Sequence, residues 1–281
     1  MPTRIDIALW TSGFASSRSH GRRIVLEGRA RLNGQSVTRP STQVTDGDEL
    51  SVQDVPVGGE YASRGAYKLV GALKDPDLGV DARGVRALDI GASTGGFTDA
   101  LLRAGALSVV AVDVGHGQLV DSLARDPRVL SLEGTDARTL TPEVTGPIDL
   151  VVSDVSFISL THLTEAMARV MRPGARALVM VKPQFEVGKS RLPNSGVVSD
   201  PALWREAVES VAASAGENCL ALTGLRPSVI RGADGNREFF LALTRTSAPC
   251  PLGPSEYDMI ARGVRAAVAE GRSPTHREGE A

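Results

Sequence analysis

The segment Ala87–Leu101, ALDIGASTGGFTDAL, is the strongest indication of the fold in this sequence. It reads as a short buried strand that ends at Ile90, a loop of small residues, and a helix that begins near Phe97. A loop without bulky side chains lets a ligand approach the backbone, and the first turn of the following helix offers unpaired N–H groups. In a doubly wound sheet such a loop lies where ligands bind. We therefore expect a ligand-binding loop from Asp89 to Phe97.

Strand-like and helix-like segments alternate after this loop. The segments of strand length are Val85–Ile90, Ser108–Val112, Val129–Leu132, Ile148–Ser153 and Ala177–Val181, and the helical ones are Phe97–Ala104, His116–Ala124 and Leu160–Met171. This alternation predicts an α/β fold in which helices cover both faces of a parallel sheet. We expect the later runs Leu220–Leu225 and Glu238–Leu243 to complete the sheet, and a last helix to cover Ser255–Glu270.

The expected ligand is S-adenosylmethionine. The loop lacks the G-x-G-x-x-G pattern, which argues against a dinucleotide. Asp113 ends the second strand, where a carboxylate can accept both ribose hydroxyls, and Asp136 follows the third, where methyltransferases contact the adenine amino group. A purely structural role of these loops in closing tight turns is the alternative. The expected cofactor-binding residues are Asp89, Gly91, Ala92, Ser93, Thr94, Gly95, Gly96, Phe97, Asp113, Val114, Asp136 and Asp154.

Lysine is rare in this chain. Of 31 lysines and arginines, only Lys68, Lys74, Lys182 and Lys189 are lysines. Lys182 and Asp154 each follow a predicted strand, so both lie at the carboxyl edge of the sheet; Glu238 opens the last strand, and Lys68 precedes the domain. A lysine beside a second cation has a depressed pKa and can take a proton from a sugar hydroxyl. The alternative is that each residue belongs to a surface ion pair.

The first sixty residues predict a separate small unit. Helical spacing covers Arg4–Ser12 and Arg18–Glu27, and short strands are expected at Ala30–Leu32, Gln35–Val37 and Glu49–Val52, with a hairpin turn at Asn33-Gly34. The glycine-rich stretch Pro56–Glu60 is the expected linker. We divide the chain into an N-terminal domain with its linker, residues 1–59, and a larger domain, residues 60–281.

Arginines are concentrated in the N-terminal unit, although the formal net charge of the whole chain is only −2. Residues 1–40 contain seven arginines against Asp6 and Glu27. A compact basic segment is typical of proteins that bind phosphate groups, and a solvated charged helix face is the alternative. The expected RNA-binding residues are Arg4, Arg18, Arg22, Arg23, Arg31 and Arg39.

Composition excludes several classes of protein. Two cysteines, Cys219 and Cys250, provide neither a disulfide framework nor a metal-ligand pattern. No apolar run approaches the ~20 residues that a membrane-spanning helix needs, and the first residues lack the apolar core of a signal peptide. We expect a soluble, cytoplasmic, monomeric protein without a bound metal.

Several motifs together resemble a known family. Arg4–Val37, with RIDIAL, SSRSHGRRI and GRARLNG, resembles an S4 RNA-binding domain. SRGAYKL, LDIGASTGGFTDALL, DVGHGQL, DVSFISL, VKPQFEVGK and GNREFFL resemble the TlyA family, bacterial ribosomal RNA 2′-O-methyltransferases of the FtsJ/RrmJ type that were historically labelled haemolysins. The resemblance covers nearly the whole chain. One departure is Glu60-Tyr61-Ala62, where some members have an Arg-Ala-Trp-Val-like linker.

The resemblance implies a function and a set of catalytic residues. It implies a Rossmann-like class I fold, and a Lys-Asp-Lys-Glu tetrad at Lys68, Asp154, Lys182 and Glu238. It also implies methyl transfer from S-adenosylmethionine to cytidine 2′-hydroxyls of ribosomal RNA, 23S alone or with 16S, in the 50S subunit alone or with the 30S. Lys182, supported by Asp154 and Lys68, is expected to deprotonate or align the hydroxyl, with Glu238 orienting the lysines.

Three other functions remain as alternatives. The family label suggests a membrane-lysing toxin, which the missing apolar spans and secretion signal disfavour. A nicotinamide-dependent reductase would use Asp113 for the ribose, but the loop pattern disfavours it. An RNA-binding factor with a vestigial methyltransferase domain is disfavoured by the intact set of lysines and carboxylates.

Overall fold

The computed structural model describes residues 2–15, 17–26, 29–52, 60–232 and 234–272. The chain divides into two compact units, Met1–Arg64 and Gly65–Ala281. Of the linker expected over Pro56–Glu60, only Glu60 lies within the described residues.

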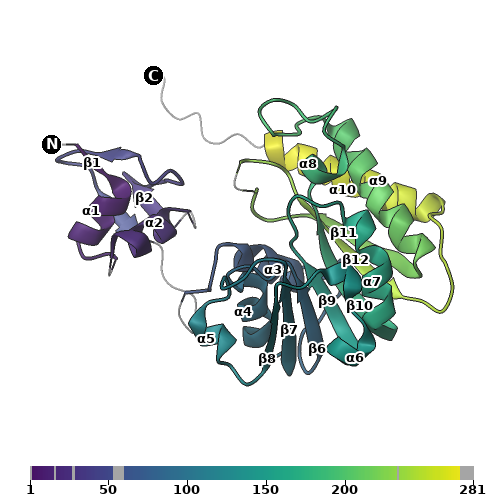
Figure 1. Ribbon diagram of the computed structural model, residues 1–281. Coiled ribbons are helices and arrows are strands. Elements are labelled where there is room, and N and C mark those ends of the chain that lie inside the picture. Colours follow the sequence, from purple (N-terminus) through teal and green to yellow (C-terminus); the bar gives the residue numbers. More distant parts are fainter. Residues whose placement is uncertain (1, 16, 27–28, 53–59, 233, 273–281) are drawn as a thin grey trace. The chain divides into compact units, whose positions relative to one another are not determined.

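The N-terminal unit consists of two helices and short strands (Figure 1). The helices are α1 (Ile5–Thr11) and α2 (Arg18–Leu26), and β2 (Ala30–Leu32) pairs with β3 (Gln35–Ser36) and β5 (Leu50–Val52). The expected helices and hairpin are confirmed: both residues of the turn, Asn33 and Gly34, have left-handed φ angles of 51° and 77°. An unanticipated pair joins β1 (Thr3–Arg4) to β4 (Gln43–Val44).

Close contact between α1 and α2 builds the core of this unit. Gly21 of α2 lies so near α1 that a Cβ there would stand 2.4 Å from the carbonyl oxygen of Asp6. The α2 N-terminus is capped by Ser17, whose Oγ accepts the backbone N–H of His20 at 3.1 Å. The core then consists of apolar side chains from both helices and the strands that follow them: Ile5, Ala8, Leu9, Ala15, Ile24, Val25, Ala30 and Val44.

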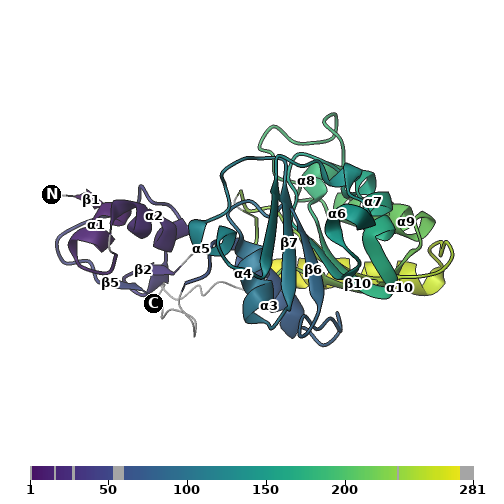
Figure 2. The ribbon, with the colours of Figure 1, turned by 60° about the horizontal axis from the view of Figure 1, so that its bottom comes forward.

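A sheet of seven strands, counted over the described residues, forms the centre of the larger unit (Figures 1 and 2). The strand order is β11-β12-β10-β9-β6-β7-β8. The strands are β6 (Arg86–Ile90), β7 (Ser108–Asp113), β8 (Val129–Glu133), β9 (Ile148–Ser153), β10 (Met171–Val181), β11 (Leu220–Pro227) and β12 (Phe239–Arg245). All five strands expected from the alternating pattern are confirmed, and the two later runs do join the sheet.

The direction of β12 corrects the expectation of a wholly parallel sheet. β12 lies between β10 and β11 and is antiparallel to both, with Val181 opposite Phe239. The start of β12 is therefore placed at the edge where the parallel strands end. The connection before β12 is short and returns directly to the sheet, as antiparallel pairing allows, whereas parallel pairing requires a crossover. This direction brings Glu238 beside Lys182.

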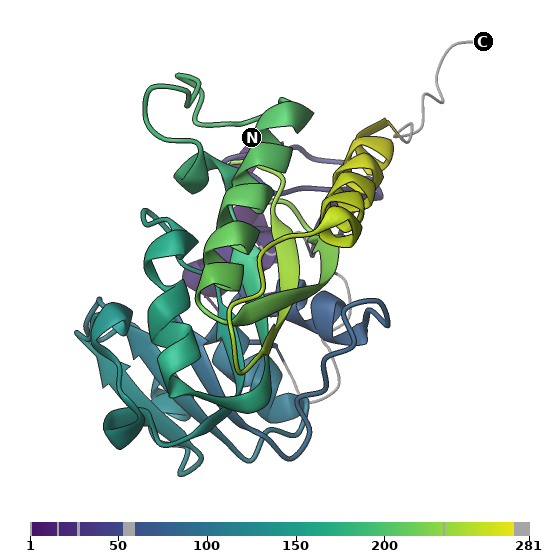
Figure 3. The same ribbon diagram turned by 90° about the vertical axis from the view of Figure 1, so that its right-hand side faces the viewer.

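Helices cover both faces of the sheet, as expected. They are α3 (Gly65–Lys74), α4 (Gly96–Arg103), α5 (Asp121–Ala124), α6 (Pro142–Thr145), α7 (Thr164–Val170), α8 (Pro183–Glu186), α9 (Pro201–Glu217) and α10 (Pro254–Arg272), with short 3₁₀ turns η1 (Ala137–Thr139) and η2 (Leu160–His162). Successive strand residues point to opposite faces. Phe239 packs on Trp204 of α9 and Phe240 on Phe97 of α4, so these helices cover opposite faces. Figure 3 shows α10 beside α9.

Two expected helices differ from those observed. The helix predicted over His116–Ala124 is confined to Asp121–Ala124. Gly117 before it has a left-handed φ of 64°, and the carboxylate of Glu133 accepts the backbone N–H groups of Gln118 and Leu119, which holds this segment as a loop. The helix predicted over Leu160–Met171 is split into η2 and α7.

No helix within the described ranges combines the length and apolarity that a bilayer crossing requires.

Asp89 is buried beneath the loop that joins β6 to α4. Its side chain has no exposed surface, and its Oδ2 accepts a hydrogen bond from the Thr98 hydroxyl at 2.7 Å. Burial, together with the negative charges of Asp154 and Asp113, raises its pKa to about 7, although the Thr98 hydrogen bonds oppose the shift. This hydrogen bond joins the end of β6 to the first turn of α4.

The pKa of Asp89 predicts a pH-dependent stability. The folded protein keeps this proton up to about pH 7, whereas the unfolded chain releases it near pH 4, so the folded state binds more protons between these values. The contribution of Asp89 to the free energy of unfolding of the larger unit should therefore be greatest below about pH 4. It should fall by about 1 kcal/mol for each pH unit as the pH rises towards 7. Asp89→Asn, which still accepts from Thr98, should abolish this contribution.

Urea unfolding between pH 4.5 and 7 measures this effect. A Trp10→Phe background leaves Trp204 of α9 as the fluorescent reporter of the larger unit. An unchanged pH slope in Asp89→Asn would contradict the assignment. Asp126→Asn, at an ion pair with Arg128 outside this loop, provides a comparison in which the Asp89 slope persists.

Candidate active site

A pocket of about 360 Å³ opens at the carboxyl edge of the parallel strands. It lies beside the ends of β6, β7 and β9 and the segments that follow β6, β7, β8 and β9. Its lining is formed by Ile90, Gly91, Ser93, Val112, Asp113, Val114, Gln118, Thr135, Asp136, Ala137, Asp154, Val155, Ser156, Phe157, Ile158 and Leu163. Six of the expected cofactor-binding residues line it: Gly91, Ser93, Asp113, Val114, Asp136 and Asp154.

The remaining residues of the glycine-rich loop do not line this pocket. Ala92, Gly95, Gly96 and Phe97 are buried, Thr94 is exposed, and Asp89 lies below the loop against Thr98. Gly95 has a φ of 97°, and a Cβ there would stand 2.3 Å from the side chain of Leu123. Its small size therefore serves the packing of the loop on the segment around α5.

Asp113 is held at the pocket by the backbone of two loops. Its Oδ2 accepts the N–H of Ser93 and its Oδ1 accepts the N–H of Gly115, each at 2.8 Å. Each carboxylate oxygen retains a second lone pair. Val114 next to it is 71 % exposed although apolar. The arrangement offers two acceptor atoms beside an open apolar surface, as an adenosine ribose and its base require.

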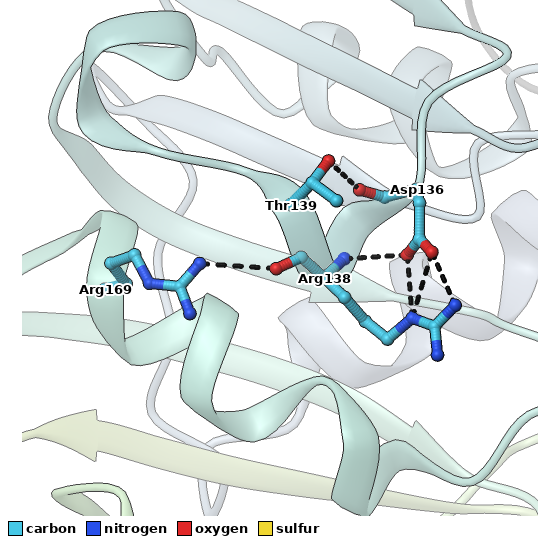
Figure 4. Close-up of polar contacts among 4 residues, drawn as sticks. All are labelled: Asp136, Arg138, Thr139 and Arg169. Atoms are coloured by element: carbon cyan, nitrogen blue, oxygen red, sulfur yellow. Dashed lines mark hydrogen bonds and ion pairs between the residues drawn. The ribbon is translucent and has the colours of Figure 1, made fainter.

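Asp136 is engaged more completely than the sequence suggests (Figure 4). Arg138 donates to both carboxylate oxygens through Nε and to Oδ2 through Nη2 at 2.6 Å, and its backbone N–H bonds Oδ1 at 2.9 Å. Three N–H donors of Arg138 thus engage most of the roughly four acceptor positions of an ionised carboxylate. Arg169 of α7 fixes the turn by donating to the carbonyl of Arg138 at 3.2 Å. The side chain therefore keeps little free acceptor capacity for a ligand amino group.

Two lysines and two carboxylates meet next to the pocket. Lys68 Nζ lies 2.6 Å from Glu238 Oε2 and 3.8 Å from Asp154 Oδ2, and Lys182 Nζ lies 2.6 Å from Asp154 Oδ1. Lys68, Lys182 and Glu238 are buried and Asp154 is mostly so. Charges alternate along this chain of contacts, which is how a folded protein tolerates buried ions. The structure thus brings together all four residues that the sequence singled out.

Each of these four side chains comes from a different element. Lys68 lies on α3, Asp154 follows β9, Lys182 precedes α8 at the end of β10, and Glu238 precedes β12. Glu238 also needs Gly232, because a Cβ at that position would stand 2.7 Å from its carboxylate. The backbone N–H of Ser228 donates to the Glu238 carbonyl at 2.8 Å, which fixes the residue at the sheet edge.

Sequence reasoning missed three residues around Lys182. Its Nζ donates to Ser156 Oγ at 2.9 Å and lies 5.8 Å from the ring centroid of Phe185. Phe157 contacts the Phe185 ring, with centroids 5.1 Å apart, yet is 91 % exposed. Its φ of 67° is in the left-handed region, which costs a non-glycine residue about 1–3 kcal/mol. The available signal was DVSFISL, in which a serine and a phenylalanine directly follow the strand-end Asp154.

The arginines of the N-terminal unit fall into two groups. Arg4 forms a bidentate hydrogen bond with the carboxylate of the buried Asp6, at 2.9 and 3.0 Å. Arg31 donates to the carbonyl of Gly34. Hydrogen bonds from Arg4 hold the pKa of Asp6 below its usual range. Arg18, mostly exposed, lies 3.6 Å from Asp6. Within the described part of the chain, Arg22 and Arg39 are exposed and form no ion pair. The side chain of Arg23 lies outside the described residues.

Glu60 is bound to the N-terminal unit. Its Oε1 contacts Arg29 Nη1 and lies 3.0 Å from His20 Nε2. Burial opposes ionisation of this carboxyl, but hydrogen bonds from Arg29 and His20 prevail and lower its pKa to about 2. Glu60 therefore neutralises a largely buried arginine of this unit.

The pocket fits S-adenosylmethionine. Asp113 presents two acceptors for ribose hydroxyls, exposed Val114 offers an apolar surface for a base, and Asp154 at the other end supplies a carboxylate beside Lys182. A positively charged sulfonium group is compatible with such a carboxylate-lined end. The pocket volume is within the range of sites for ligands of this size.

Comparisons with known proteins agree with this geometry. The model of the FtsJ-like methyltransferase family matches residues 61–245, and the S4 domain model matches residues 3–50. The chain is 43 % identical to the 16S/23S rRNA (cytidine-2′-O)-methyltransferase TlyA of Mycobacterium tuberculosis, over 95 % of this chain and 98 % of that protein. It is 36 % identical to Hemolysin A of Brachyspira hyodysenteriae, over 84 % and 97 % of the two chains.

A solved structure shares the whole architecture. The protein from Streptococcus thermophilus, which carries the name hemolysin, superposes with a TM-score of 0.72 at 33 % identity and covers 97 % of this chain and 99 % of its own. The residues that the two family models match, 3–50 and 61–245, span the N-terminal unit, the loop between β6 and α4, and the positions of the four clustered lysines and carboxylates. The chain therefore belongs to the TlyA family, in which an S4 domain precedes an FtsJ-like methyltransferase domain.

Proposed function

We propose that this protein transfers a methyl group from S-adenosylmethionine to the 2′-hydroxyl of a cytidine in ribosomal RNA. The 23S RNA of the 50S subunit is the proposed substrate, with the 16S RNA of the 30S subunit as a second, because the Mycobacterium tuberculosis relative bears both RNAs in its name. Acting on ribosomal subunits implies a cytoplasmic enzyme, and we propose that it acts as a monomer.

The observation that carries the proposal is the buried chain of charges at the pocket edge. A ribose hydroxyl is a weak nucleophile, so it must be aligned with the methyl group and lose its proton. Bound S-adenosylmethionine supplies the electrophilic methyl group. Lys182 Nζ, fixed by Asp154 and Ser156, lies next to the pocket. As an ammonium it can donate to the hydroxyl oxygen and align it, and as a neutral amine it can accept the hydroxyl proton. Lys68, itself paired with Glu238, contacts Asp154 from the other side.

The cofactor residues follow from the pocket. Gly91, Ser93, Asp113, Val114, Asp136 and Asp154 line it and are proposed to contact the cofactor directly. The buried members of the loop, together with Asp89 beneath it, are proposed to shape the backbone there. This division separates residues that touch the ligand from residues that hold the loop.

The N-terminal unit supports a nucleic-acid substrate. Exposed Arg22 and Arg39, with Arg18 beside Asp6, offer guanidinium groups to phosphates. Phe157, exposed beside the pocket, presents an aromatic face on which a nucleobase can stack. A nucleotide whose hydroxyl reaches Lys182 must be turned out of its stack.

Lys182→Ala should lower the rate of methyl transfer by about 10²–10⁴-fold, the usual range for loss of a positioned acid–base group. Affinity for S-adenosylmethionine should change little, because Lys182 does not line the pocket. The measurement is incorporation of labelled methyl groups into purified ribosomal subunits, with 2′-O-methyl positions mapped by resistance to alkaline cleavage. Lys74→Ala, on an exposed position of α3, is the matched control.

Lys182→Arg separates the two roles of the lysine. Arginine keeps the charge and the donors but cannot readily give up its proton to become a base. Activity as low as that of Lys182→Ala assigns proton acceptance to the lysine, and partial activity assigns alignment. Wild-type methylation by Lys182→Ala would overturn the catalytic assignment.

Arg22→Ala and Arg39→Ala should each weaken binding to ribosomal RNA and reduce the slope of log K against log salt by about 1, as expected for one lost phosphate contact. Binding isotherms at several salt concentrations provide the slope. Arg83→Ala removes an exposed arginine already paired with Asp81 in the other unit and should leave the slope unchanged. If Arg22→Ala and Arg39→Ala both kept the wild-type slope, these phosphate contacts would be excluded.

A further inference from the structure

The loop that carries Ser156 and Phe157 is fastened to the helix that follows Lys182. Glu186, the last residue of α8, accepts a hydrogen bond from the Ser159 hydroxyl at 2.5 Å and from the backbone N–H of Leu160 at 2.9 Å. These groups lie 26 and 27 residues before Glu186 in the sequence. One carboxylate therefore joins the segment after β9 to the segment after β10.

The loop from Asp154 to Ser159 has a strained backbone that must be held by contacts with its surroundings. Between Asp154 and Ser159 it contains Phe157, whose left-handed backbone is unfavourable for a phenylalanine and persists only where the surroundings impose it. Beyond Ser159 the chain turns into η2, whose first turn Ser159 caps through the N–H of Thr161. Glu186 receives hydrogen bonds from the residue that caps this turn and from the first residue of the turn, so it fixes the downstream end of the loop.

The Glu186 carboxylate is well suited to this role. Burial raises its pKa, and the hydrogen bonds from Ser159 and Leu160 oppose the shift. A half-buried acceptor with two donors resists displacement, because removing it would leave both donors without their partner. The contact between the Phe157 and Phe185 rings reinforces the same junction from the residue before Glu186.

We propose that Glu186 is a positioning residue for the lysine site: it holds the loop from Ser156 to Ser159 against α8 and thereby keeps Ser156 Oγ within hydrogen-bond reach of Lys182 Nζ. The proposal rests on the proposed function only for its effect on catalysis. Glu186 acts through Ser156, so loss of either residue releases the same hydrogen bond to Lys182. The two losses are therefore predicted to overlap.

Amine reactivity tests the proposal without any RNA substrate. The chain has four lysines, so competitive acetylation with peptide mapping by mass spectrometry reports each one separately. Lys182 should become several-fold more reactive in Glu186→Ala, Ser159→Ala and Ser156→Ala, while Lys74 stays unchanged. Glu143→Gln, an exposed acid on α6 before the start of β9 and hence at the opposite edge of the sheet, should leave Lys182 as in the wild type. Wild-type reactivity of Lys182 in Glu186→Ala would overturn the proposal.

Catalysis provides the second readout. Glu186→Ala should lower kcat about tenfold, whereas Glu186→Gln, which still accepts from Leu160, should recover much of the loss. The double variant Glu186→Ala/Ser156→Ala should be no slower than the slower single variant, and the two single variants should share the same shift in the pH–rate profile. Multiplicative losses would show that Glu186 does not act through Ser156.

The two readouts distinguish the possible failures. Absence of methylation by the wild-type protein, with the acetylation pattern as expected, would reject the proposed function and keep the role of Glu186. If the wild type methylates the RNA but the acetylation reactivity of Lys182 is the same in the variants, the proposed function is kept and the role of Glu186 is rejected. If Glu186→Ala does not fold, as judged by circular dichroism, Ser159→Ala still decides the question, because it removes one of the two donors to Glu186.

Discussion

The site depends on one constraint, which is that two lysines and two carboxylates are removed from water together. A buried ion is tolerated only beside a partner of opposite charge, and here each ion has one: Glu238 with Lys68, and Asp154 with Lys182. The four groups come from four different elements, so the fold must bring these elements to one edge of the sheet. The antiparallel direction of β12 meets this requirement, because it places the residue before the strand opposite the end of β10.

The cofactor loop shows how one sequence feature meets two demands. Small residues there suggest close approach of a ligand, and Gly91 and Ser93 do line the pocket. Gly95 is required instead by the side chains of Leu119 and Leu123, which leave no room for a Cβ. Asp89 likewise serves the loop from below, through Thr98. Ligand binding and tight packing favour the same residue types, so a sequence pattern alone does not separate them.

Charge in the N-terminal unit is also divided between structure and binding. Arg4 and Arg29 neutralise carboxylates of their own unit, Asp6 and Glu60, and contribute to its stability. Arg22 and Arg39 project into solvent. The local excess of arginine therefore overstates the number of groups available to RNA phosphates. An arginine is recognised as available only when its distance to neighbouring carboxylates is known.

The sequence by itself determined the strands of the larger sheet, the helices α1, α2, α4 and α10, the two-part organisation and the four clustered ionic residues. Hydrophobic periodicity and strand-end positions are local properties. The helices α3 and α9 and the pair of β1 with β4 were not anticipated. The antiparallel β12 and the loop in place of a helix at His116–Val120 arise only in the tertiary structure. Each depends on a partner distant in sequence, β10 for β12 and Glu133 for the loop. Glu186 is the clearest case, since its role arises from donors 26 and 27 residues away that no periodic pattern connects to it.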